Sequence, residues 1–434
     1  TGFDAGKAAR KRIPRSDQAS ATLAPGRDPL RIIADQDRQR IPHLIPLRHE
    51  RMARSTFSFF RGTAAVMAAD LAATPTTGAI VQACGDCHLA NFGLFGTAER
   101  NVIFDLHDFD ESLPAPWEWD VKRLATSAVL VGRDLGGSER EARTAALSVA
   151  EAYRSEMRTS AQSSALDVWF SRVDPQVFLS TLDAAQARSI ERKQRDMTQR
   201  GEHVPPKFVA KTGGKLSFME DPPVLYHLPH NDPLRKRGFE GLRRYAKTLR
   251  DDTRVVFSRY HLRDAAIRVV GVGSVGLHSA IALFQAGADD VLILQLKEAT
   301  ASVLEPYAGA SVYANHGQRV VAGQRLMQSS SDIFLGWSEI ETGQHYYVRR
   351  FRDRRANANL ERLGLEELIQ YSALCGATLA IGHARSGDAA FLSGYMGRGR
   401  KFDEAIADFA VAYADHAQRD YETFIASEQM ERAG

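Results

Sequence analysis

Apolar residues recur at helical spacing near both ends of the chain and gather in short runs between them. Residues 47–73 place apolar side chains three and four positions apart, and helical patterns also run from 117 to 195 and from 360 to the end. From about 264 to 350 the apolar runs are short and are broken by glycine, which is typical of strands. The pattern predicts an α+β fold in which a β-rich block separates two helical segments.

Length and composition divide the chain further. Its 434 residues exceed the roughly 250 that a single core usually holds, so we expect two lobes. Residues 1–45 mix Pro, Arg and Asp without periodicity, which predicts an extended, partly disordered arm over the surface. Pro, Gly, His and Lys concentrate between 197 and 238 and mark a boundary. We therefore expect a helical lobe built from 46–200 and 356–434 and a β-rich, nucleotide-binding lobe at 201–355.

Charge and cysteine content limit the partners. The net charge of +3 is too small to indicate a nucleic-acid or membrane partner. Three cysteines cannot form a disulfide framework, and the basic N-terminal residues contain no apolar signal segment. We also find no run of about 18 apolar residues. We therefore expect a cytoplasmic protein that acts on a small molecule or on another protein.

The stretch ACGDCHLANFG, residues 83–93, fits three kinds of site. Cys84, Cys87 and His88 form the C-x-x-C-H of covalent haem attachment, and the two cysteines alone match a redox dithiol. Asp86 and Asn91 have the D-x-x-x-x-N spacing of a kinase catalytic loop.

The rest of the chain disfavours haem, redox and zinc chemistry. Covalent haem attachment accompanies export, and the sequence shows no export signal. A redox dithiol begins a helix, whereas residues 91–93 do not continue one. Zinc needs a second ligand pair, which Cys375 alone cannot supply. We expect Cys84 and Cys87 to be small buried residues that flank a functional loop.

A kinase loop needs an Asp that orients the acceptor hydroxyl and an Asn that holds Mg²⁺. Asp86 and Asn91 have this spacing, although an Asx-type turn also explains it. The second metal ligand of a kinase is an acidic residue at a nearby strand end, and here the predicted strand 102–106 runs into a carboxylate cluster. Asp108 is favoured because it lies just beyond the strand, with Asp105 as the alternative. The candidate metal ligands are Asn91, Asp108 and Asp110.

The phosphate-binding parts lie far downstream. Gly271, Gly273 and Gly276 form G-x-G-x-x-G after an apolar strand, with Ser274 inside the loop. Lys297 lies within a later apolar strand, as the lysine of V-A-I-K does. Glycines allow backbone amides to approach phosphates, and the lysine neutralises their charge. These five residues are the candidate nucleotide-binding residues.

The same glycines match the turn of a dinucleotide-binding fold, in which residues 278–288 form a helix. That fold needs an acidic residue at the end of the second strand, yet Glu298 here comes only after Lys297. No alternating series of strands and helices follows. The kinase interpretation is therefore favoured, with the dinucleotide fold and a purely structural glycine turn as alternatives.

Six segments together resemble a bacterial family catalogued as domain of unknown function 2252, over nearly the whole chain. They are CGDCHLANFG, FDLHDFDES, PWEWDVKRLATS, GVGSVG, LQLKEA and IGHARSG. Separately, the catalytic loop and the acidic strand resemble aminoglycoside phosphotransferases and the wider protein-kinase-like superfamily. This second resemblance implies a two-lobed kinase-like fold.

Kinases run from glycine loop to lysine, catalytic loop and metal aspartate, whereas here the catalytic loop comes first. The resemblance therefore implies a circular permutation, which folds with neighbouring termini tolerate. It also implies that Asp120 holds the backbone of the catalytic loop. The helix after the lysine lacks the usual glutamate partner, which leaves Glu305 or Gln324 as stand-ins. His88 and Arg123 either face the substrate or make structural hydrogen bonds.

The resulting hypothesis is phosphoryl transfer from ATP, with Mg²⁺, to an unidentified hydroxyl-bearing small molecule or protein. Lys297 and the glycine loop bind the phosphates, Asn91 and Asp108 hold the Mg²⁺, and Asp86 orients the acceptor. AMP transfer by the same residues and a catalytically inactive, nucleotide-binding regulator are the alternatives.

Overall fold

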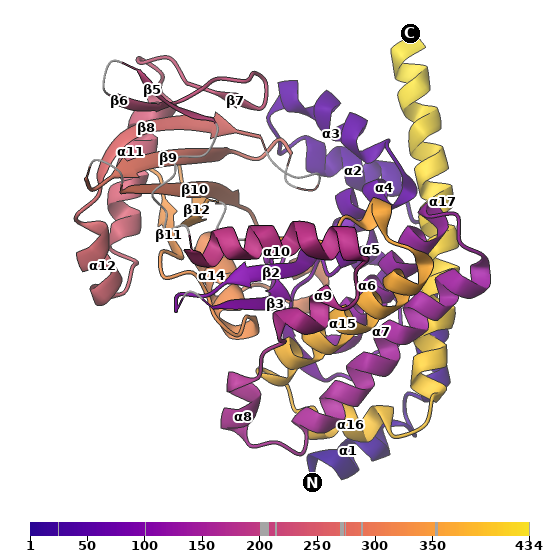
Figure 1. The fold of residues 1–434 in the computed structure, drawn as a ribbon. Coiled ribbons are helices and arrows are strands. Elements are labelled where there is room, and N and C mark those ends of the chain that lie inside the picture. The colour runs from indigo at the N-terminus through magenta and orange to yellow at the C-terminus, as the bar shows by residue number, and fades with distance from the viewer. Residues whose placement is uncertain are drawn as a thin grey trace.

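The computed structural model describes residues 1–24, 26–99, 101–199, 208–212, 215–269, 273, 275–287, 290–351 and 355–433. A helical part and a β-rich part lie side by side (Figure 1). Helices that precede and follow the β-rich part in sequence pack together, so the chain leaves the helical part and returns to it. The α+β class predicted from the apolar pattern is confirmed.

Four long helices form the centre of the helical part: α6 (Trp117–Asp134), α7 (Glu139–Ser160), α15 (Leu365–Ala384) and α17 (Lys401–Ala433). A capping box of Ser138 and Glu141 begins α7. Helix α15 lies close against α7, because a Cβ on Gly376 would be 2.3 Å from the Val149 carbonyl oxygen. Helix α17 packs on both α6 and α7. One hydrophobic core therefore joins segments from both ends of the chain.

Shorter helices surround this centre. They are α1 (Gly2–Ala9), α2 (Pro29–Asp37), α3 (Ile45–Met52), α4 (Thr56–Gly62), α5 (Ala64–Leu71), α8 (Ala165–Phe170), α9 (Pro175–Leu179), α10 (Ala184–Gln199) and α16 (Ala389–Met396), with 3₁₀ turns η1 (Arg15–Ala19), η2 (Pro42–Leu44), η3 (Leu89–Asn91) and η4 (Leu360–Arg362). Within the described residues, none of the helices combines the length and the hydropathy that crossing a bilayer requires.

The main sheet is antiparallel and has the order β11-β12-β10-β9-β8-β7. Its strands are β7 (Leu225–Tyr226), β8 (His261–Arg268), β9 (Ser279–Gln285), β10 (Val291–Ala299), β11 (Gly336–Glu339) and β12 (His345–Arg350). Helices α11 (Pro233–Ala246) and α12 (Asp251–Phe257) lie along it, and α13 (Glu305–Ala308) and α14 (His316–Met327) connect β10 to β11. The alternation of side chains along β9 and β10 buries apolar residues on both faces.

Three small sheets complete the fold. Strand β1 (Ile80–Ala83) pairs with β4 (Leu113–Pro116), β2 (Phe92–Gly96) lies between β3 (Val102–Leu106) and β13 (Arg355–Ala356), and β5 (Val209–Thr212) pairs with β6 (Lys215–Phe218). Strands β1, β2 and β3 carry the loop 84–91 and the acidic segment after residue 106. The boundary expected between 197 and 238 contains β5, β6 and β7, and residues 201–207 within it lie outside the described part.

Three expectations need correction. Residues 1–45 do not form an extended arm, since α1, η1 and α2 are helical and α1 packs closely on α16. The helical pattern over 47–73 does form helices, but it is divided among α3, α4 and α5, because Ser55 caps a new helix by accepting a hydrogen bond from the Ser58 amide at 3.2 Å. Residues 279–285 form strand β9 and not a helix, so the antiparallel sheet contradicts the dinucleotide-binding alternative.

Candidate functional site

Asp120, in the first turn of α6, holds the start of the loop 84–91. Its carboxylate oxygens accept hydrogen bonds from the backbone amides of Cys84 at 2.6 Å and Gly85 at 2.9 Å. His383 lies 3.1 Å from the same carboxylate, and its other ring nitrogen is 2.8 Å from the Tyr153 hydroxyl. All these groups are buried, and bonds to a charged acceptor are strong there. Asp120 thus fixes the loop backbone, as the resemblance implied.

The motif residues Asp86 and Asn91 lie at either end of the same turn. One oxygen of Asp86 accepts two hydrogen bonds from the Arg123 guanidinium, the one from Nε at 2.7 Å. Burial raises the pKa of Asp86, and Arg123 opposes this shift. The Asn91 side-chain amide donates to the Asp86 carbonyl at 2.6 Å, and the Asn91 carbonyl accepts from the His107 amide at 2.8 Å. The loop is therefore held in one conformation, and Arg123 orients Asp86.

The carboxylates that follow β3 face different partners. Asp108 is half-buried and lines the same cavity as Asp86. Asp110 forms an ion pair with Lys297 of β10 and accepts a hydrogen bond from the Tyr347 hydroxyl at 2.7 Å. Burial lowers the pKa of Lys297, but the carboxylates of Asp108 and Asp110 outweigh it, so that its pKa is raised. The lysine is therefore charged and fixed at the acidic end of β3.

Asp105, the alternative metal ligand, has a structural role instead. Its side chain is buried and accepts hydrogen bonds from Ser329, from the amide at 2.9 Å and the hydroxyl at 2.8 Å. It thereby attaches the segment after α14 to β3. Glu305 and Gln324, the two alternatives for the partner of Lys297, bind other residues. The side-chain amide of Gln324 donates to the side-chain oxygen of Gln328, and the Glu305 carboxylate lies 3.9 Å from Nε of Arg319.

Glu111 and Arg319 both lie at this site, although the sequence patterns had not singled them out. Glu111 lines the cavity, accepts a hydrogen bond from the Val303 amide at 2.7 Å, and has its pKa raised to about 7 by burial. Arg319 of α14 donates to the carbonyls of Ser112 and Asp110, each at 2.7 Å. The run of acidic residues in FDLHDFDES could have indicated Glu111. No local motif indicates Arg319.

The glycine loop between β8 and β9 packs against the segment that precedes α5. Gly271 and Ser274 lie outside the described residues. A Cβ on Gly273 would be 3.2 Å from the Arg61 carbonyl oxygen, and one on Gly276, whose φ is +90°, would be 2.8 Å from the Cβ of Arg40. The Gly276 carbonyl also accepts a hydrogen bond from the Ile41 amide at 2.8 Å. At position 276, both the close contact with Arg40 and the backbone conformation require glycine.

A cavity of about 340 Å³ brings these elements together. Its polar lining residues are Gln36, Gln39, Arg40, Arg61, Asp86, His88, Asn91, Asp108, Asp110, Glu111, Glu298, Thr300 and Ser302, and Gly273 contributes from the glycine loop. Lys297 is buried and is not itself a lining residue, but it forms an ion pair with Asp110, which is one. The catalytic-loop residues, the acidic segment and the glycine loop therefore share one cavity.

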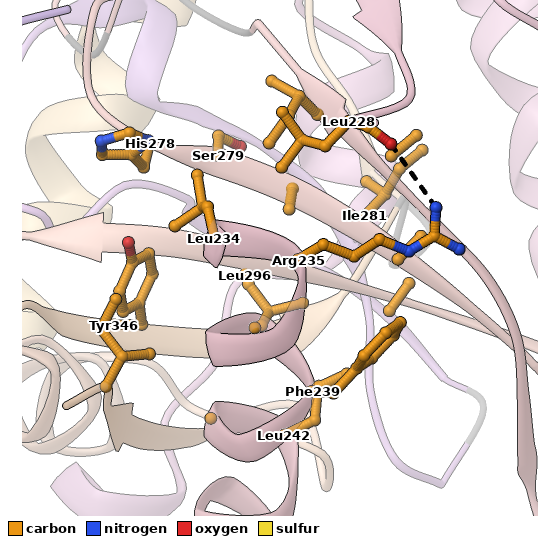
Figure 2. A pocket seen from close by; sticks show the side chains of 18 of the residues that line it. Leu228, Leu234, Arg235, Phe239, Leu242, His278, Ser279, Ile281, Leu296 and Tyr346 are labelled. Atoms are coloured by element: carbon orange, nitrogen blue, oxygen red, sulfur yellow. Dashed lines mark hydrogen bonds between the residues drawn. The ribbon is translucent and has the colours of Figure 1, made fainter. Parts of the chain in front are cut away.

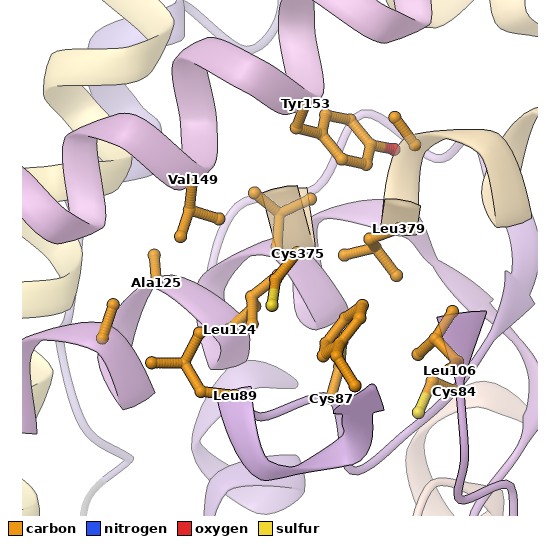
Figure 3. Close-up of a cluster of buried hydrophobic side chains, with 14 of the residues drawn as sticks. Cys84, Cys87, Leu89, Leu106, Leu124, Ala125, Val149, Tyr153, Cys375 and Leu379 are labelled. Carbon is orange, nitrogen blue, oxygen red and sulfur yellow. The ribbon is translucent and has the colours of Figure 1, made fainter. Parts of the chain in front are cut away.

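The two cysteines of the C-x-x-C-H stretch have different surroundings, since Cys84 lines the cavity and its thiol donates to the Asp108 carbonyl at 3.3 Å. Cys84, Cys87 and Cys375 form no disulfide and are buried beside apolar side chains such as Leu89 and Leu379 (Figure 3). Burial raises the pKa of the Cys87 thiol well above its usual value. A buried thiol with a raised pKa is a poor nucleophile. Cys87 and Cys375 are packing residues, and Cys84 also ties the loop to the acidic segment through its hydrogen bond to Asp108.

A second pocket, of about 90 Å³, lies between α11 and the main sheet (Figure 2). Its lining is mostly apolar and includes Phe239, Leu296 and Tyr346, with Arg235 donating to the Leu228 carbonyl at 3.5 Å. Leu296 and Lys297 are neighbours on β10, so their side chains point to opposite faces of the sheet. This pocket is therefore separate from the cavity that contains the carboxylates.

Comparison with known sequences places the chain in a family. It belongs to the DUF2252 family, described as uncharacterized proteins conserved in bacteria, whose profile matches residues 40–427. The resemblance indicated by the six sequence segments is thus confirmed. No curated protein and no solved structure was found to match the chain. Family membership by itself assigns no activity to the cavity.

Proposed function

We propose that this member of the DUF2252 family is an ATP- and Mg²⁺-dependent phosphotransferase with a circularly permuted, protein-kinase-like arrangement. The observation that carries the proposal is the ion pair between Lys297 and Asp110, beside Asp86 and Asp108. In protein kinases the lysine lies on the third strand of the sheet and a glycine-rich loop covers the phosphates. Here Lys297 lies on β10, which follows β8 and β9 in the chain, with the short strand β7 before them in the same sheet, and the glycine loop joins β8 to β9.

The end of α15 supports the permuted order. In an unpermuted kinase-like chain, the corresponding helix leads directly into the catalytic loop. The Gln82 amide, two residues before the loop, donates to the Ser386 hydroxyl at 2.8 Å across 304 residues of sequence. His383 of α15 also contacts Asp120, which binds the loop backbone. The end of α15 thus lies beside the start of the loop 84–91, and this arrangement supports the permuted order.

The proposed reaction moves the γ-phosphoryl group from ATP to an acceptor hydroxyl. The hydroxyl oxygen forms a bond to the γ-phosphorus, the bond from that phosphorus to the β,γ-bridging oxygen breaks, and ADP leaves. Asp86 accepts the hydroxyl proton, a role favoured by its raised pKa. Arg123 keeps the carboxylate oriented, and Lys297 neutralises phosphate charge.

The residues present fit a magnesium ion that is bound together with nucleotide. Within the described ranges there is no group of three or more His, Cys, Asp or Glu side chains able to hold a metal. Mg²⁺, however, commonly uses one or two carboxylates together with substrate phosphates and water. Asn91 and Asp108 would hold it, and Asp110 serves as the lysine's partner. Bound Mg²⁺ would neutralise negative charge on the phosphates.

Product analysis tests this proposal without a known acceptor. We expect purified protein with Mg·ATP to form ADP slowly, or to phosphorylate itself as seen by intact mass. Asp86→Asn should reduce that rate by about 10²- to 10⁴-fold. Formation of AMP-modified protein or pyrophosphate would instead indicate nucleotidyl transfer. Nucleotide binding with no turnover of any kind would indicate an inactive regulator.

A further inference from the structure

Two arginines line the cavity without an ion pair to any carboxylate among the described residues. Arg40 follows α2 and Arg61 lies in the last turn of α4, and both belong to the segment that packs on the glycine loop. The Arg40 guanidinium donates to the Val275 carbonyl, and its Nε is buried without a partner. In the described part of the chain, Arg61 has no hydrogen bond or ion pair from its side chain. Its guanidinium lies 5.9 Å from the centre of the Phe57 ring.

Arg40 and Arg61 are half-buried, whereas fully buried arginines near this site are paired. Arg123 binds Asp86, and Arg48 binds Asp37 at 2.7 Å. An unpaired buried charge is costly, because it loses hydration without gaining an interaction. Burial lowers the pKa of Arg40 to about 10, so that it remains protonated at neutral pH. A ligand that carries negative charge would supply the missing interaction.

The position of Arg61 indicates which part of the reaction it serves. Burial lowers the pKa of Arg61, and the carboxylates of Asp86 and Asp108 partly oppose the shift, so its charge lies near both. Its backbone contacts Gly273 of the glycine loop. A negatively charged group at Arg61 would therefore lie beside the proposed base. Two arginines without a direct ion pair match a phosphate, which carries nearly two charges, better than a carboxylate.

We infer that Arg40 and Arg61 bind a phosphate group of the acceptor, so that the acceptor is a small molecule with both a hydroxyl and a phosphate. The inference rests on the proposed phosphotransfer and specifies its substrate class. A cavity of about 340 Å³ suits a small molecule better than a protein segment. The arginine fork binds phosphate through two hydrogen bonds, and this geometry favours arginine over lysine.

Inorganic phosphate is the probe, measured by calorimetry with and without saturating Mg²⁺ and a non-hydrolysable ATP analogue. We expect phosphate to bind when the analogue is present, and Arg61→Gln to weaken phosphate binding at least about tenfold while the analogue binds as before. Arg61→Lys, which keeps the charge, should bind phosphate better than Arg61→Gln. Arg54→Gln is the matched control, because Arg54 is 65% exposed and pairs with the exposed Glu50.

The outcomes separate this inference from the proposed function. If the analogue displaces phosphate and Arg61→Gln weakens the analogue instead, the arginines bind the nucleotide and the acceptor assignment is wrong. Phosphate binding that Arg61→Gln leaves unchanged, in a protein that still binds the analogue, overturns the inference alone. A parent protein that does not bind the analogue overturns the proposed function, whatever the phosphate result.

Discussion

Lys297 and Asp110 are separated by 187 residues of sequence and form an ion pair in which the lysine is 4% exposed. The pair joins the main sheet to the acidic segment after β3. In the proposed kinase-like arrangement it stands in for the lysine–glutamate pair of kinases, since α14 offers no glutamate. The acidic segment is therefore both the candidate metal site and the anchor of the lysine.

Replacing both members of this pair should cost less stability than the two single replacements added together. Lys297→Met or Asp110→Asn alone should lower the free energy of unfolding by about 1–3 kcal/mol, because each leaves the partner's charge uncompensated. The double variant should lose less than the sum of the two, with a coupling of about 1–3 kcal/mol in urea unfolding. The exposed pair Arg254–Asp251 is the control, with coupling under about 0.5 kcal/mol. Additive effects at Lys297 and Asp110 would show that the pair contributes nothing.

Among the carboxylates at the site, Asp120 of α6, which holds the loop 84–91, should be the one whose substitution lowers stability most. Asp120→Ala removes the acceptor for two buried backbone amides, each hydrogen bond to a charged group being worth about 1.5–3 kcal/mol. We expect a loss of about 3–5 kcal/mol in unfolding free energy, and a smaller loss for Asp120→Asn, which keeps one acceptor oxygen. Asp251→Ala, at a side chain 92% exposed, should change stability by less than about 0.5 kcal/mol. Equal unfolding midpoints for Asp120→Ala and the parent would contradict this role.

Glu111 should make the metal-free protein less stable as the pH rises. Its pKa is about 7 in the folded chain, above its ordinary value of 4.5, so the folded state binds the proton more tightly than the unfolded state. The resulting stabilisation is full below pH 4.5 and is lost as the pH rises through 7, by up to about 3 kcal/mol.

Urea unfolding from pH 4 to 8 in the presence of a chelator measures this effect. Glu111→Gln should be less dependent on pH than the parent over the interval from 4.5 to 7, and more stable than the parent at pH 8. Other buried acids contribute equally to both proteins, so the difference reports Glu111. Parallel curves for the two proteins would contradict the raised pKa.

The fold could be predicted from the sequence where a local pattern of apolar residues determines the helix or strand. Strands β8, β9 and β10 follow from apolar runs broken by glycine, and α6 and α7 follow from helical periodicity. The helices in residues 1–45 were not predictable, because they depend on close packing: a Cβ on Gly6 would lie 2.0 Å from the Phe391 carbonyl oxygen. Contacts between distant segments decide such short helices, and the local pattern does not encode these contacts.

The site could be predicted only in part, because only some of its residues lie together in a local motif. Asp86 and Asn91 lie in one motif, and their shared turn follows from their spacing. The partner of Lys297 was not predictable, because the residue that replaces the kinase glutamate comes from another part of the chain. Arg40 and Arg61 belong to no motif, and only the folding of the segment 38–62 onto the glycine loop brings them to the cavity.

Calorimetric titration with ATP, with and without Mg²⁺, tests the central claim most directly. The account predicts Mg²⁺-dependent binding to the parent protein, at least about tenfold weaker binding to Lys297→Ala and Asp108→Ala, and nearly unchanged binding to Asp86→Asn. These differences follow because Lys297 contacts phosphate, Asp108 holds the metal and Asp86 acts only on the acceptor. A parent protein that binds no ATP, or three variants that all bind Mg·ATP as the parent does, would contradict the account.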